Sequence, residues 1–293
     1  MESYLMVTAA VLLLAVDFSL QKLYQKRMGT AFTTGLVFNV LIGLFTAVIF
    51  FFINGCRLHF SLFSILMAAA MSSLCILYSL IGFRILKTGN MAFYTLALMS
   101  GGMTIPYVYG LLFLHEDFSF LRLVGLILIL VAVVSSNMAE GKIDGKLILY
   151  CAAVFILNGF VSVVSKLHQI DLTHSPVSAN EFVIYAGIMK VILSGLTLLL
   201  FRAFSKDAAP EKPSSASKTV LLITIASAFV SGLSYMLQLL GASRLPASVL
   251  YPFITGGSIV LSTVAGMLFF KEKVSKKLIL SVILCFVGTC LFL

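Results

Sequence analysis

The chain has 293 residues, of which 60% are apolar and 11% are charged, and its mean hydropathy is +1.11. This composition excludes an ordinary soluble globular domain. The formal net charge of +9 does not indicate nucleic-acid binding, because the lysines and arginines are scattered and form no patch interleaved with aromatic residues. The sequence therefore predicts a multi-pass protein of the cell membrane, with the lipid bilayer as its surroundings.

Apolar segments of about 20 residues follow one another along the chain, and each is long enough to cross a hydrocarbon core about 30 Å thick as a helix. They are separated by charged residues or by Gly, Pro and Asn. The predicted spans cover residues 3–24, 30–54, 61–84, 91–114, 119–138, 147–168, 179–202, 219–242, 247–270 and 275–293. The expected fold class is an all-α integral membrane protein with about ten transmembrane helices.

The second half of the chain repeats the first. Residues 109–133 read YGLLFLHEDFSFLRLVGLILILVAV, and residues 265–289 read AGMLFFKEKVSKKLILSVILCFVGT, so that Glu116 matches Glu272. Near the start of each half, LQKLYQ and VSKLHQ align Lys22 with Lys166. We therefore expect two five-span repeats, in residues 1–140 and 141–293.

Five spans are an odd number, so the second repeat must enter the membrane in the opposite direction to the first. Inverted repeats of this kind are typical of transporters, which hold their substrate near the bilayer midplane where the repeats meet. The loops after spans 1, 3, 5, 7 and 9 carry most of the basic residues. The positive-inside rule therefore predicts that these loops are cytoplasmic and that both termini lie outside.

The repeat ends GLLFLHE and GMLFFKE, together with the paired lysines in QKL and SKL, resemble the EamA-like transporters of the drug/metabolite transporter (DMT) superfamily. The resemblance covers essentially the whole chain as architecture. It implies a ten-helix transporter with a central cavity, of a kind that often exports amino acids or other metabolites. It also implies that both termini lie in the cytosol, the reverse of what the loop charges predict.

Lys190 lies in the middle of an apolar span, nine residues after Glu181 and twelve before Arg202. At 1.5 Å per residue it is roughly 13 and 18 Å from the two interfaces, which is near the midplane. A charge at that depth costs about 3 kcal/mol and usually faces the bundle interior or a watery cavity. We expect Lys190 to bind a carboxylate or phosphate of the substrate. The alternatives are a structural ion pair and a neutral buried amine.

Asp17 is predicted at nearly the same depth, nine residues before Lys26. It could pair with Lys190 and offer both charges to a zwitterion, or it could bind a proton as the coupling ion. A static salt bridge without substrate contact is the alternative. Gln21 follows Asp17 by four residues, so it shares the same helix face and adds a hydrogen-bonding group.

Other polar side chains within the spans need hydrogen-bonding partners, and we expect about half of them to face a substrate pathway. These are Asn39, Tyr78, Tyr94, Asn158, Tyr235, Gln238 and Tyr251. Lys22 and Lys166 lie close to span ends, where they can snorkel to the interface as topology anchors or act as gates. Glu116 and Glu272 open the helix that follows each of them, so we interpret both as helix caps.

Motifs of enzymes, metal sites and cofactor sites are not found. The chain has no HExxH, no G-x-S-x-G and no P-loop, and its five cysteines form no CxxC or Cys/His pairing. The sequence therefore predicts a non-enzymatic secondary transporter, without cofactor or metal, for a small polar metabolite such as an amino acid. We expect it to be an exporter that works by alternating access around a central midplane site. The alternatives are a multidrug exporter and a non-transporting membrane scaffold. A monomer or a homodimer is compatible with the sequence.

Overall fold

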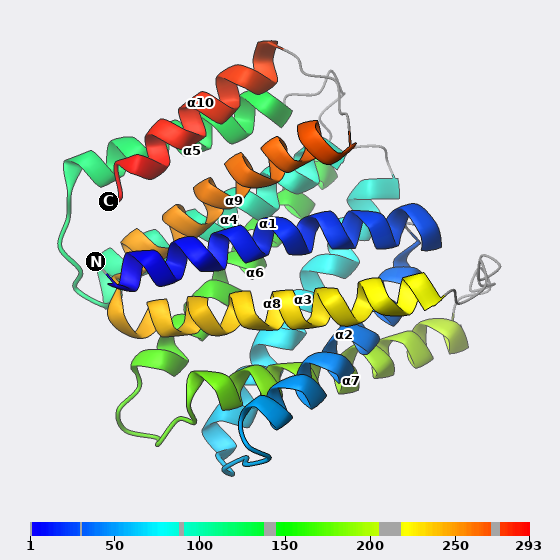
Figure 1. Ribbon diagram of the computed structural model, residues 1–293. Coiled ribbons are helices and arrows are strands. Elements are labelled where there is room, and N and C mark those ends of the chain that lie inside the picture. The colour runs from blue at the N-terminus through cyan, green and yellow to red at the C-terminus, as the bar shows by residue number, and fades with distance from the viewer. Residues whose placement is uncertain (1, 30, 88–90, 138–144, 205–217, 271–275) are drawn as a thin grey trace.

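The structure, a computed structural model, describes residues 2–29, 31–87, 91–137, 145–204, 218–270 and 276–293, and within these ranges the chain forms ten α-helices (Figure 1). Their bounds are α1 Glu2–Met28, α2 Phe32–Ile53, α3 Leu62–Lys87, α4 Met91–Phe113, α5 Phe120–Asn137, α6 Gly145–Ile170, α7 Ala179–Phe204, α8 Lys218–Arg244, α9 Ala247–Phe270 and α10 Lys276–Cys290. The helices follow the predicted spans closely, because each apolar run continues until polar or helix-breaking residues end it.

Eight of these helices are long and apolar enough to cross a membrane. The other two, α5 and α10, are shorter as far as they are described, with apolar parts at Phe120–Ser135 and Ile279–Cys290. Sixteen residues of α-helix reach only about 24 Å, which is less than the roughly 30 Å of a hydrocarbon core. The described residues therefore support eight of the ten predicted spans by length and composition.

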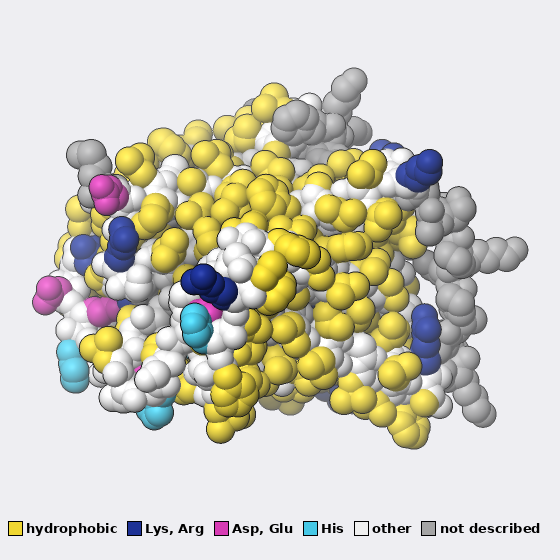
Figure 2. Space-filling view, turned by 60° about the horizontal axis from the view of Figure 1, so that its bottom comes forward, with side chains coloured by type: hydrophobic (Ala, Val, Ile, Leu, Met, Phe, Trp, Pro, Cys, Tyr) yellow, Lys and Arg dark blue, Asp and Glu magenta, His cyan; other side chains and the backbone are white. Residues whose placement is uncertain are grey.

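The outer surface of the bundle is apolar. Figure 2 shows apolar side chains over most of one face, with charged and histidine side chains gathered toward its ends. Leucine and phenylalanine side chains such as Leu12, Leu44, Leu199 and Phe286 are exposed along the helices. An apolar surface of this extent is unfavourable in water but matches lipid tails, so the chain has the outer surface of a multi-pass membrane protein.

The helices pair in a regular way. α1 packs against α8 and α9, α6 packs against α3 and α4, and α2 packs against α7. α4 also packs against α9, while α5 and α10 form a pair at one edge of the bundle (Figure 1). Helices from the two halves of the chain are therefore interleaved throughout.

In two of these helix pairs, a glycine of one helix lies against a glycine of the other at the point where the helices cross. A Cβ atom on Gly43 of α2 would lie 2.7 Å from the carbonyl oxygen of Gly187 in α7, and one on Gly187 would lie 2.8 Å from the oxygen of Gly43. Gly125 of α5 and Gly288 of α10 face each other in the same way. Small residues allow two backbones to approach this closely, which increases the packing area between membrane helices.

Both chain termini lie at the same end of the bundle (Figure 1). The connections that follow α2, α4, α6 and α8 lie at that end too, and we call it the terminal end, made of residues 54–61, 114–119, 171–178 and 245–246. Among the predicted functional residues, Glu116 lies in a connection of the terminal end, and Lys166 lies near the end of α6, which leads to it.

Candidate functional site

Lys190 lies inside the bundle, half-buried on α7, about 16 Å along the helix from its first residue. The Gly43 backbone of α2 packs beside it, since a Cβ atom on Gly43 would lie 3.2 Å from the Cβ of Lys190. Its charge interacts electrostatically with the carboxyl group of Asp17 and the thiol of Cys75. Among the described residues, however, no hydrogen bond or ion pair to the Lys190 ammonium is formed.

Asp17 is held by two hydrogen bonds. The Ser227 hydroxyl of α8 donates to Oδ1 at 2.5 Å, and the Gln21 side-chain amide donates to Oδ2 at 2.7 Å. The predicted neighbour relation of Asp17 and Gln21 is therefore confirmed. Within the described residues, Asp17 and Lys190 form no direct ion pair. The partner of the Asp17 carboxylate is Ser227, not the lysine that the sequence suggested.

Ser227 was not predicted as a functional residue, although the spacing of the serines in this span could have indicated it. Ser227 and Ser234 lie seven residues apart in an apolar span, which places them on one face of α8. The structure turns that face toward α1, where the Ser234 hydroxyl donates to the carbonyl oxygen of Ala10 at 2.7 Å. Ser227 and Ser234 therefore lie on the side of α8 that contacts α1, the helix that carries Asp17.

Three tyrosines from neighbouring helices gather around Cys75, which interacts electrostatically with Lys190. The Tyr78 hydroxyl shares a side-chain hydrogen bond with Cys75, and both Tyr94 and Tyr235 interact electrostatically with Cys75. All four side chains are half-buried. We call the following group the midplane polar cluster: Asp17, Gln21, Cys75, Tyr78, Tyr94, Lys190, Ser227 and Tyr235.

Six of these eight residues were predicted from the sequence as substrate-binding candidates. Cys75 was expected only to fill apolar space, like the other cysteines, and Ser227 was not singled out. The cluster draws on α1, α3, α4, α7 and α8, so residues far apart in the chain meet in the interior of the bundle. An ammonium group can bind an anion through charge-assisted hydrogen bonds, so Lys190 gives this interior cluster a candidate anion-binding group.

Two other predicted candidates, Asn158 and Tyr251, tie helices together, whereas Gln238 bonds a residue of its own helix. The Asn158 side-chain amide donates to the carbonyl oxygen of Leu98 at 2.7 Å, which joins α6 to α4. The Tyr251 hydroxyl donates to the carbonyl oxygen of Ser162 at 2.6 Å, and the Gln238 amide donates to the Ser234 hydroxyl at 3.1 Å. These hydrogen bonds give the three side chains a structural role. Asn39 is half-buried on α2, and its part in a pathway stays a prediction.

Lys166 does not snorkel to the interface as expected. Its side chain is buried, and its ammonium group donates to the carbonyl oxygens of Ala242 and Leu245, both at 2.6 Å. Ala242 lies in the last turn of α8, where carbonyl groups have no partner within the helix and the helix dipole favours a cation, and Leu245 directly follows the helix. Lys166 therefore caps the carboxyl end of α8. Its sequence counterpart Lys22 is exposed near the end of α1.

Glu116 is a helix cap, as predicted, but for another helix. Its carboxylate accepts hydrogen bonds from the backbone N–H groups of Ala247 at 2.5 Å and Ser248 at 2.8 Å, at the start of α9. The following helix, α5, was the expected partner. Glu116 and Lys166 also attract each other electrostatically. At the turn between α8 and α9, Lys166 thus binds the end of α8 and Glu116 binds the start of α9. Glu272 lies outside the described residues.

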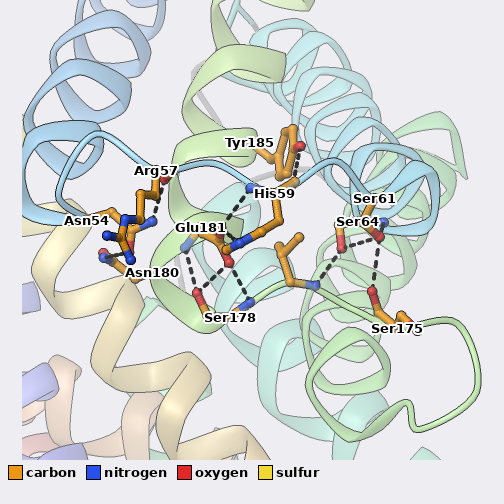
Figure 3. Close-up of polar contacts among 11 residues, drawn as sticks. Asn54, Arg57, His59, Ser61, Ser64, Ser175, Ser178, Asn180, Glu181 and Tyr185 are labelled. Atoms are coloured by element: carbon orange, nitrogen blue, oxygen red, sulfur yellow. Dashed lines mark hydrogen bonds and ion pairs between the residues drawn. The ribbon is translucent and has the colours of Figure 1, made fainter.

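The loop between α2 and α3 is fastened to the start of α7 (Figure 3). Glu181 Oε1 accepts a hydrogen bond from the His59 backbone N–H at 2.9 Å and contacts His59 Nδ1 at 2.6 Å. The Tyr185 hydroxyl donates to the His59 carbonyl oxygen at 2.7 Å. Glu181 also bonds Ser178, which forms a capping box whose S-x-x-E pattern is readable in the sequence.

The loop between α6 and α7 contains a turn built on Asp171. The backbone N–H of His174 donates to Asp171 Oδ1 at 2.7 Å, the His174 ring contacts Oδ2 at 2.9 Å, and the Thr173 N–H donates to Oδ1 at 2.9 Å. These hydrogen bonds stabilise the ionised carboxylate and lower the pKa of Asp171 to about 2. The hydrogen bond from the His174 backbone N–H has the largest effect. Within the described residues no three His, Cys, Asp or Glu side chains gather as a metal site would require.

Comparison with known proteins identifies the fold alone. No family model matches the chain, and no curated protein matches it. A solved structure, described only as the crystal structure of a protein, aligns with 99% of this chain and 96% of its own, with a TM-score of 0.71 and 16% sequence identity. At that identity the likeness extends to the arrangement of the helices and no further.

Proposed function

We propose that this protein is a secondary transporter of a small polar metabolite, such as an amino acid or a related anion, and that it works by alternating access. The observation that carries the proposal is the midplane polar cluster, in which Lys190 and Asp17 lie deep inside an apolar helix bundle. Ionisable side chains at that depth are costly and usually mark a substrate or ion pathway.

The helix pairing supports two oppositely oriented repeats, residues 1–140 and 141–293. In these repeats α1 corresponds to α6, α2 to α7, α3 to α8, α4 to α9 and α5 to α10. The contact of α1 with α8 then corresponds to that of α6 with α3, and the contact of α1 with α9 corresponds to that of α6 with α4. The pairs α2 with α7, α4 with α9 and α5 with α10 map onto themselves. This exchange is the pattern expected of inverted repeats, whose relative rocking would expose a central site to each side in turn.

Contacts between the proposed repeats at the terminal end would have to break when that end opens. Glu116 of the first half holds the start of α9, and the α2–α3 loop of the first half holds Glu181 of the second. The proposed outward and inward states therefore differ in these hydrogen bonds. Asp17 is our candidate for a proton site, since a buried carboxyl group beside a cation can couple proton and substrate binding.

The resemblance to EamA-like transporters of the DMT superfamily is consistent with this proposal. The test is a flux assay with purified protein in sealed proteoliposomes, over a panel of labelled amino acids, organic acids and cationic drugs, with and without a proton gradient. We expect saturable flux of one polar solute class, and its loss in Lys190→Met. Flux of cationic drugs that survives Lys190→Met would indicate a multidrug exporter. No flux of any solute would overturn the transport function and favour a scaffold.

A further inference from the structure

We propose that the central site selects a small organic monoanion, with one carboxylate and no ammonium group, over the matching amino acid. This inference rests on the proposed transport function and narrows its substrate class. Lys190 would bind the carboxylate of the solute.

The two charges of the cluster differ in their availability. Asp17 is 3% exposed, and each of its oxygens already accepts a hydrogen bond, one from Ser227 and one from Gln21. Ser227 itself is fully buried. The Asp17 carboxylate keeps further lone pairs, but it is almost completely buried, so a substrate ammonium group could reach it only if the helices around it moved apart.

Lys190 is in the opposite situation. Its side chain is half-buried, and no described residue forms a hydrogen bond or a direct ion pair with its ammonium group. An ammonium group has three N–H donors and no acceptor, so a carboxylate oxygen is its natural partner. The cluster therefore presents an available cation and an anion that its own neighbours have already satisfied.

The remaining side chains are neutral. Cys75 interacts electrostatically with Lys190, and the phenols of Tyr78, Tyr94 and Tyr235 interact with Cys75 in turn. The Tyr235 hydroxyl is already hydrogen-bonded to Ser165 and Met71. Phenols donate and accept hydrogen bonds but provide no counter-charge for a substrate ammonium group. Lys190 is also the single cation among the eight residues of the cluster, so a dianion would leave at least one of its two charges without a partner.

The experiment compares solutes that share a carbon skeleton. Each set contains a 2-hydroxy acid, the matching 2-amino acid and the matching amino alcohol, with a methyl, isobutyl or benzyl side chain. Uptake is measured as counterflow in proteoliposomes, and binding as the shift in melting temperature in detergent. In at least one set we expect the hydroxy acid to be taken up at least about tenfold faster than the amino acid, because the ammonium group lacks a partner.

Variants separate a role of Lys190 from a general loss of folding. Lys190→Met should abolish the preference for the hydroxy acid, and Lys190→Arg should preserve it by keeping the charge. Lys26→Met, which removes an exposed lysine at the end of α1, is the matched control and should behave as the unaltered protein does. The hydroxy acid should raise the melting temperature of the unaltered protein and of Lys190→Arg, but not that of Lys190→Met.

The outcomes distinguish this inference from the transport function. Faster uptake of the amino acid or the amino alcohol in every set would overturn the inference and leave transport standing. A thermal shift specific for the hydroxy acid without any flux would support the monoanion site and overturn transport. Neither flux nor thermal shift with any solute would overturn both.

Discussion

The crossing of α2 and α7 beside Lys190 gives a sharp test of the helix packing. The substitution Gly43→Ala adds a single methyl group, whose carbon would lie 2.7 Å from the backbone oxygen of Gly187. It would also lie 3.1 Å from Val191 and 3.2 Å from Lys190. The side chain of Val191 can move aside, but the carbonyl oxygen belongs to the α7 backbone. The two helices must therefore separate by about 0.7 Å to restore an ordinary contact distance.

Overpacking of this kind typically costs about 1–3 kcal/mol, while replacing glycine by alanine within a helix gains up to about 1 kcal/mol. The net loss of unfolding free energy for Gly43→Ala should therefore be about 0–2 kcal/mol. Gly35→Ala on the same helix is the matched control, because no atom lies within 4 Å of its added methyl group. That variant should be neutral or slightly stabilised.

Both variants can be compared by thermal or denaturant unfolding of the purified protein in detergent. Since they share the helix and the chemical change, the difference between them isolates the crossing with α7. We expect Gly43→Ala to be the less stable by about 1–3 kcal/mol. Equal stability of the two variants would refute the close approach of Gly43 to Gly187, and with it the placement of Lys190 against α2.

Three further predictions concern the polar contacts. Ser227→Ala should lower the unfolding free energy by about 1.5–3 kcal/mol, because it removes a hydrogen bond to the buried Asp17 carboxylate, whereas Ser231→Ala one turn away should change it by less than about 0.5 kcal/mol. Similar melting temperatures for the two serine variants would contradict this. Glu116→Gln should cost about 1–3 kcal/mol in the same assay, since one of its two bonds to the start of α9 loses its acceptor; an unchanged melting temperature would show that the carboxylate does not hold α9. Asp171→Asn should destabilise the protein at neutral pH but less and less as the pH falls from about 4 toward 2, because a carboxyl group whose pKa is lowered on folding contributes stability only while it is ionised. Asp117→Asn, at an exposed position in the α4–α5 loop, is the control, and a destabilisation by Asp171→Asn that stays constant over this pH range would refute the assignment.

The lengths and bounds of the helices could be predicted from the sequence. The span predicted at 179–202 is found as α7 at Ala179–Phe204, and the span predicted at 247–270 agrees with α9. This success has a local cause, because a backbone in lipid must satisfy its own hydrogen bonds and so remains helical as long as the residues are apolar. The depth of a residue follows from the same argument, which is why Lys190 and Asp17 were expected inside the bundle.

Only the tertiary structure decided which groups these residues meet. Asp17 bonds Ser227 across 210 positions of sequence, Glu116 bonds Ala247 across 131, and Lys166 bonds Ala242 across 76. Hydrophobic periodicity is weak in helices that are apolar on all sides, so it cannot fix how a helix is rotated or which neighbour it faces. The partners of the buried charges therefore depend on helix packing, which determines that Asp17 is satisfied by its neighbours while Lys190 is left available.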